Sequence, residues 1–152
     1  MKSFFRKLSI IALMLITFYI PSRADVIQVG TGIVLGNYPF TQIDEDAASY
    51  FLYRAAEIVA AGGSAGMIRS IAFQVNTDPN QLFPLTFKGL TISMQTTTAT
   101  NVTGPITTGW QQVYYSASYT MTSTGWNTFS FPENSYFNYT SGQNLLVKVC
   151  FN

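Results

Sequence analysis

The alternation of apolar and polar side chains is clearest at the C-terminal end of the chain. Side chains on a strand point alternately to its two faces. The segment Leu145–Phe151 therefore predicts a strand with one mixed face and one fully apolar face, formed by Leu145, Val147, Val149 and Phe151. Gly125–Phe131 shows a similar pattern, with Phe129 and Phe131 on one face. A connection rich in Gly, Asn, Ser and Pro joins the two segments, which are predicted to line the inside of a β-sandwich.

Shorter patterns of the same kind recur through the preceding residues. They predict strands over Asp25–Val29, Met67–Val75, Phe87–Met94 and Trp110–Met121. The last of these is expected to bend near Ser116–Ser118. Ala47–Ala61 carries both strand and helix signals, and its pattern alone leaves the two open. About eight short strands without sustained helical periodicity predict an all-β fold, a jelly-roll-like antiparallel β-sandwich.

The N-terminal residues have the features of a signal peptide. A basic start is followed by an apolar run of about 13 residues, Leu8–Ile20, which is short for a membrane span. Pro21 ends the run, and cleavage is expected after Ala24. Residues 1–24 are thus predicted to be a cleaved signal peptide and residues 25–152 a β-sandwich domain. The alternative is an uncleaved anchor. Cleavage predicts a protein without a membrane span that is secreted or at the cell surface, with the periplasm as a further destination.

Charge and cysteine content narrow the range of partners. The chain has 8 Lys and Arg and 7 Asp and Glu. Four basic residues lie in the predicted signal peptide, so the remaining chain has 4 basic and 7 acidic residues and a net charge of −3. A basic surface for nucleic acid is therefore not expected. Cys150 is the only cysteine, so an internal disulfide is excluded; a partly covered structural thiol and an intermolecular disulfide are the two alternatives.

The chemistry available to the chain argues against catalysis. It has no histidine, which excludes Ser-His-Asp and Cys-His nucleophile systems and all His-ligated metal sites. No glycine-rich segment has the spacing of a phosphate-binding loop. Glycoside hydrolysis needs two carboxylates at a defined separation, and nothing in the sequence selects such a pair. The protein is therefore expected not to be an enzyme and to need no cofactor.

Two groups of residues are candidates for binding. Aromatic side chains at a rim can stack on sugar rings, and the candidates are Trp110, Tyr114, Tyr136 and Tyr139. The alternative is that these rings belong to the core, which is the expectation for Trp126. Asp44, Glu45 and Asp46 form a weak calcium candidate, because hard cations take carboxylate oxygens. A solvated acidic loop is the alternative for these three residues.

Several segments together resemble a known module. Tyr53–Ile58, Gly66–Phe73, Leu90–Met94, Gly125–Phe131 and Asn144–Phe151 look like the first β-sandwich module after the signal peptide in secreted, adhesin-like proteins of Bacteroidota that use the type IX secretion route. The resemblance implies an extracellular sandwich in a modular surface context and supplies no catalytic residues. It also favours a strand through about Arg54, followed by a helical turn over Ala55–Ala60. A stand-alone domain and a truncated piece of a larger surface protein both fit.

Two functions follow from these features. The first is a non-catalytic binding or adhesion module for an extracellular glycan or another surface polymer, acting through the aromatic residues. The alternative is a structural or assembly domain that pairs an edge strand with another surface protein. The final strand, expected to be an uncapped edge, and the lone Cys150 motivate this second hypothesis.

Overall fold

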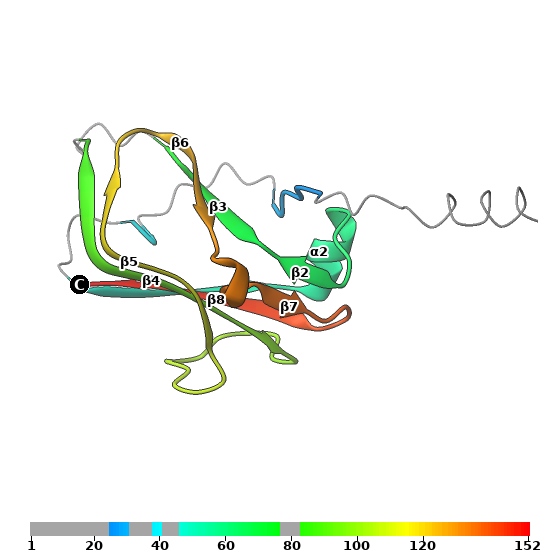
Figure 1. The fold of residues 1–152 in the computed structure, drawn as a ribbon. Helices are drawn as coiled ribbons and strands as arrows, with labels where there is room; N and C mark the ends of the chain where they lie inside the picture. The colour runs from blue at the N-terminus through cyan, green and yellow to red at the C-terminus, as the bar shows by residue number, and fades with distance from the viewer. Residues whose placement is uncertain (1–24, 31–37, 41–45, 77–82) are drawn as a thin grey trace, which may run out of the picture.

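The computed structural model describes residues 25–30, 38–40, 46–76 and 83–152, and it is mostly β (Figure 1). Every strand pair in this part of the chain is antiparallel. A four-stranded sheet has the order β1-β8-β4-β5. Its strands are β1 (Ala47–Tyr53), β8 (Asn144–Phe151), β4 (Leu85–Thr97) and β5 (Gln111–Met121). The predicted signal peptide lies outside the described residues.

Two strand pairs and two short helices complete the described structure. One pair joins β3 (Ser70–Val75) to β6 (Gly125–Ser130), and the other joins β2 (Gly66–Ile68) to β7 (Phe137–Tyr139). The helices are α2 (Ala55–Ala60) and the 3-10 turn η1 (Glu133–Ser135). The β3–β6 pair lies over one face of the four-stranded sheet (Figure 1). We call that face the inner face and the opposite one the outer face.

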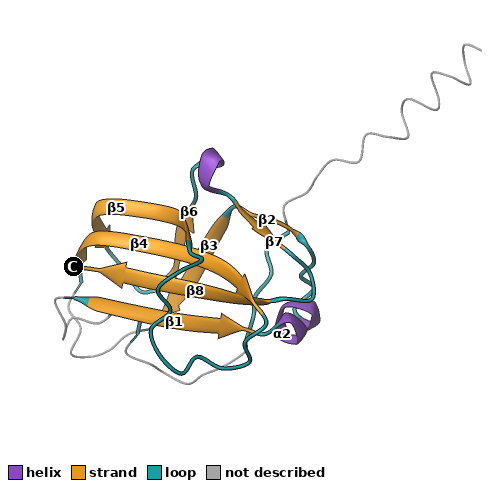
Figure 2. Ribbon diagram, turned by 90° about the horizontal axis from the view of Figure 1, so that it is seen from below, coloured by secondary structure: helices purple, strands orange, loops and turns teal. Residues whose placement is uncertain are grey.

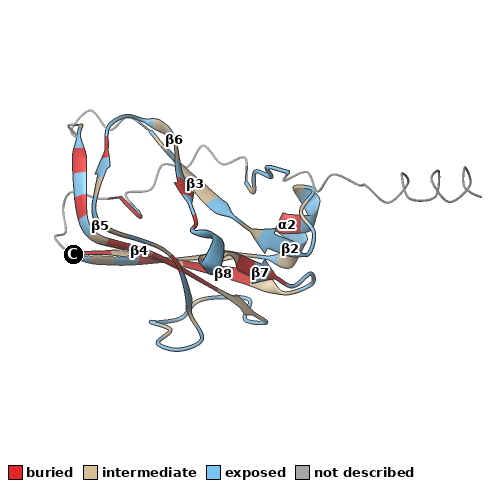
Figure 3. Ribbon diagram, viewed as in Figure 1, coloured by how far each residue is buried: buried red, intermediate tan, exposed pale blue. Residues whose placement is uncertain are grey.

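The last strand, β8, pairs on both of its edges. Val147 lies opposite Phe51 of β1 and Met94 of β4. The predicted apolar face is confirmed, because Leu145, Val147, Val149 and Phe151 are all buried (Figure 3). The expectation that this final strand offers a free edge is wrong, since it lies inside the sheet. The edges are β1 and β5, seen at the two sides of the sheet in Figure 2.

Strands β4 and β5 turn out of the plane of the sheet and toward β6 (Figure 1), and the backbone of β4 has an unusual conformation at Gly89. Gly89 has a φ of +58°, a conformation that residues with a Cβ rarely adopt. The buried positions of β4 change parity here, from Leu85 and Phe87 to Leu90, Ile92 and Met94. In β5 the partners of the flanking residues are Ser116 and Ser118, which is where a bend was predicted.

Aromatic rings hold the β3–β6 pair on the inner face. Phe129 of β6 lies with its ring centroid 5.3 Å from that of Tyr114 and 4.9 Å from that of Tyr119, both on β5. The ring centroid of Phe73 of β3 lies 5.6 Å from that of Phe51 of β1. Phe129 therefore packs against the sheet near one edge and Phe73 near the other, and the core fills the space between.

The segment after β1 resolves the competition between strand and helix. β1 ends at Tyr53, and α2 covers the predicted residues Ala55–Ala60. The backbone N–H of Arg54 donates to the Glu57 carboxylate at 2.8 Å, and the carbonyl of Arg54 accepts from the backbone N–H of Glu57 at 2.9 Å. The Glu57 side chain thus caps the first turn as in one half of a capping box, while the bond to the Arg54 carbonyl closes the turn itself. Ile58 is its buried residue.

Three local expectations are wrong. Asp25–Val29 forms no strand. The single strand expected over Met67–Val75 is divided at Arg69, because β2 and β3 pair with different partners and the Arg69 carbonyl accepts from the Phe131 N–H at 2.8 Å. Trp126 is 55 % exposed instead of buried, because it lies on the side of β6 opposite to Phe129.

Truncation of Phe129 should remove the main contact between the two layers. We expect Phe129→Ala to lower the free energy of unfolding by about 3–5 kcal/mol, since the ring is 1 % exposed and deletion leaves a cavity. Trp126→Ala, three positions away on the same strand, is the matched control and should change it by less than about 1 kcal/mol. Urea denaturation measures both values. Equal losses in the two variants would contradict the proposed packing.

Candidate functional site

The connection from β4 to β5 crosses the outer face of the sheet. Residues 98–110 run below the sheet in Figure 1 and in front of β8 and β1 in Figure 2. The side-chain amide of Asn144 fixes one end of this connection by donating to the Ala99 carbonyl at 2.8 Å. Near the other end, Trp110 Nε1 donates to the Ile106 carbonyl at 2.9 Å. The connection is thereby folded back on itself and presents the Trp110 ring to the sheet.

Three side chains meet beneath this connection, and we call them the outer-face cluster: Tyr50, Trp110 and Lys148. The ring centroids of Tyr50 and Trp110 are 6.0 Å apart, with an angle of 47° between the rings. The Lys148 ammonium lies 5.0 Å from the centroid of the Trp110 ring. Tyr50 and Lys148 are directly paired across β1 and β8. All three side chains are half-buried, so each keeps part of its surface accessible.

Short side chains lie beside the cluster on the same face. Cys150 is the next residue of β8 after Lys148 whose side chain lies on the outer face. It is paired with Ala48 of β1 on one side and with Thr91 of β4 on the other. The next residue across is Tyr115 of β5, which is 58 % exposed. The face thus has two aromatic groups separated by a row of small side chains.

Cys150 is a free, partly covered thiol in this row. Burial raises its pKa, and the nearby Lys148 charge opposes that rise in part. A raised pKa keeps the thiol protonated and weakly nucleophilic near neutral pH.

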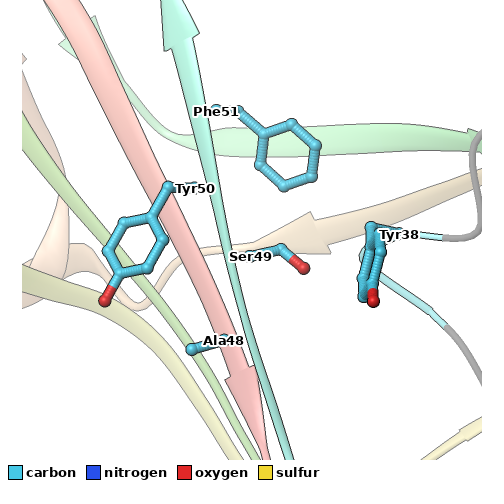
Figure 4. Close-up of a pocket in the computed structure, with 5 residues that line it drawn as sticks. All are labelled: Tyr38, Ala48, Ser49, Tyr50 and Phe51. Atoms are coloured by element: carbon cyan, nitrogen blue, oxygen red, sulfur yellow. The ribbon is translucent and has the colours of Figure 1, made fainter. Parts of the chain in front are cut away.

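A small pocket lies at the edge of the sheet, next to β1. Its volume is about 210 Å³, and it is lined by Tyr38, Ala48, Ser49, Tyr50 and Phe51. Ser49 and Phe51 point to the side of β1 that faces Tyr38, while Tyr50 points to the other side (Figure 4). The Ser49 hydroxyl is buried and has no hydrogen-bond partner in the described part of the chain. The Tyr38 side chain is 60 % exposed.

The structure does not bring the four predicted aromatic residues together. Trp110 belongs to the outer-face cluster, whereas Tyr114 lies on the inner face against Phe129. Tyr136 is half-buried, with the Arg69 guanidinium 5.5 Å from its ring centroid, away from the cluster's contacts. Only Trp110 of the four is therefore retained for the site.

Tyr139 is part of the core. Its ring is 4 % exposed, and its hydroxyl donates to the Gln143 carbonyl at 2.7 Å across the turn into β8. A buried ring whose hydroxyl is already hydrogen-bonded offers no surface to a ligand. Tyr139 is therefore a core residue and not a ligand-binding candidate.

Sequence reasoning missed Tyr50 and selected neither Tyr115 nor Lys148. The alternation in β8 places Lys148 on its mixed face, which is a usable signal. Tyr50 gives no such signal, because its position next to Lys148 depends on pairing between segments about 100 residues apart.

The calcium hypothesis is not addressed by the described residues. Asp44 and Glu45 lie outside them, and Asp46 is exposed directly before β1. Within the described ranges, no group of three or more His, Cys, Asp or Glu side chains is placed to hold a metal ion. Calcium binding stays a prediction.

The described residues contain no helix long and apolar enough to cross a bilayer. No protein-family model matches the chain, and neither the curated proteins nor the solved structures contain a match. The geometry of the chain itself is therefore the basis for inferring its function.

Proposed function

We propose that this chain is an exported, non-catalytic binding module that recognises a glycan, or another extracellular polymer, through the outer-face cluster. The observation that carries the proposal is the position of Trp110 on the outer face, 6.0 Å from Tyr50 and 5.0 Å from Lys148. Aromatic faces attract the C–H groups of sugar rings, and an ammonium donates hydrogen bonds to hydroxyl or carboxylate oxygens.

The cluster is held in place before any ligand binds. The bond from Trp110 Nε1 to the Ile106 carbonyl restricts the indole ring. Tyr50 and Lys148 project from two paired strands, and one of these, β8, is bonded on both edges. A restricted site loses less conformational entropy on binding than a mobile one. The smaller entropy loss allows a ligand to bind even where the surface makes few contacts with it.

The wider context of the proposal comes from the sequence. The basic and apolar N-terminal pattern supports a signal peptide ending at Ala24, and therefore a secreted or cell-surface protein. The antiparallel sheet with a second strand pair over its inner face supports a β-sandwich of jelly-roll type. Both features suit the adhesin-like Bacteroidota module that the sequence resembles.

Replacement of Trp110 tests the proposed function. We expect the purified protein to bind at least one member of a panel of extracellular polysaccharides. Trp110→Ala should weaken that binding roughly tenfold or more, because stacking is lost. Trp126→Ala is the control, since Trp126 is exposed on the other layer and should not matter. Affinity electrophoresis measures binding, and circular dichroism confirms that each variant is folded. A folded protein that binds no polysaccharide, or equal binding by both variants, contradicts the proposal.

A second candidate function is assembly through the edge strand β1. This strand pairs with β8 on one side and lies at the edge of the sheet. The buried Ser49 hydroxyl, which has no hydrogen-bond partner among the described residues, favours the idea, because such a group is destabilising and a polar side chain of a partner entering the pocket would satisfy it. Tyr38, whose side chain is largely exposed, forms one wall of the same pocket.

Analytical ultracentrifugation tests the assembly function. At high micromolar concentration we expect a dimer that persists in reductant, since β1 pairing does not need the Cys150 thiol. Tyr38→Lys should shift the equilibrium toward monomer by placing a charge at the pocket. Tyr115→Lys, on the other edge strand, is the matched control. A monomer at every concentration would rule out self-assembly through β1.

A further inference from the structure

The charges of the four-stranded sheet are few and all of one sign. Strands β1 and β5 contain no charged residue, β4 contains only Lys88, and β8 contains only Lys148. The connection over the outer face, residues 98–110, is also uncharged. The binding surface proposed above is therefore built almost entirely from neutral side chains around one ammonium group.

Lys148 is half-buried, and in the described part of the chain it has no carboxylate within salt-bridge distance. Its contact is the face of the Trp110 ring. Such a contact leaves N–H donors of the ammonium free for another partner. The acidic residue closest in sequence to Tyr50 is Asp46, four positions earlier, which corresponds to roughly 13 Å along an extended strand. A carboxylate from outside the chain would thus meet no competing carboxylate from the described residues at Lys148.

We infer that the outer-face cluster binds an acidic polysaccharide, with a uronic-acid ring against Trp110 and Tyr50 and its carboxylate at Lys148. This inference rests on the proposed function and names the class of sugar that the site selects. A hydrogen bond between charged groups is stronger than one between neutral groups, so the carboxylate determines the preference. The rings bind the apolar face of the sugar, which a free anion lacks.

Neighbouring polar groups suit the remaining hydroxyls of such a sugar. Ser93 of β4 is paired with Lys148 of β8 on one side and with Gln112 of β5 on the other. Ser93 is buried, whereas Gln112 is exposed and presents an amide that can both donate and accept. Binding groups therefore extend from β1 to β5, across the strands rather than along them.

Matched polymers test this inference. The probes are polygalacturonate, alginate and hyaluronate, each paired with its carboxyl-reduced or methyl-esterified form, which keeps the rings and removes the charge. We expect the protein to prefer at least one acidic form roughly tenfold. Lys148→Gln should remove that preference and Lys148→Arg should retain it. Lys88→Gln is the control, because it removes the other lysine of the sheet. Thermal unfolding confirms that the variants are folded.

The outcomes separate this inference from the function on which it rests. Equal binding of charged and neutral forms, lost in Trp110→Ala, would overturn the acidic preference and leave the glycan-binding function in place. Binding to dextran sulfate as tight as to the uronates, weakened equally by Lys88→Gln and Lys148→Gln, would show non-specific attraction of a polyanion to surface lysines and would also overturn it. A folded protein that binds none of the polymers would contradict both.

Discussion

The pairing of β8 on both edges is the constraint on which the rest of the structure depends. Its inner face supplies Leu145, Val147, Val149 and Phe151 to the core, while its outer face carries Lys148. Pairing with β1 sets Tyr50 beside Lys148, and pairing with β4 sets Ser93 on its other side. The same ladder thus builds the core and aligns the outer-face cluster. A slip of the ladder by one residue would turn each side chain of β8 to the opposite face and destroy both.

The bend in β4 gives the two ends of this strand different roles, one in the core and one in the sheet that carries the outer-face cluster. Before the bend, β4 and β5 turn toward β6, where Tyr119 packs against Phe129. On the other side of the bend both strands lie in the sheet. There the end of β4 and the start of β5 are joined by the connection that carries Trp110. The backbone N–H of Asn152, just beyond β8, donates to the Lys88 carbonyl at 2.8 Å beside this bend. The fold can therefore close a core on one face while keeping aromatic groups accessible on the other.

Local pattern predicted the elements that have strong alternation. The apolar face of β8 and the buried Leu90, Ile92 and Met94 of β4 follow from a period of two residues. Neighbouring residues could not reveal which strands pair, so the division at Arg69 and the meeting of Tyr50, Trp110 and Lys148 were missed. Trp126 and Tyr139 were misplaced because an aromatic residue fits equally well on either face of a strand. Their exposure depends on the layer above them, which is formed by distant segments.

The most direct test of the outer-face cluster is NMR spectroscopy of the indole N–H groups. The chain has only two tryptophans, so the spectrum should contain two such signals, assigned with Trp126→Phe. A uronate oligosaccharide is then titrated into the labelled protein. We expect the Trp110 signal to shift and saturate, because its ring lies beside Tyr50 and Lys148, while the Trp126 signal stays in place. Saturable binding that shifts Trp126 alone, or neither signal, would contradict it.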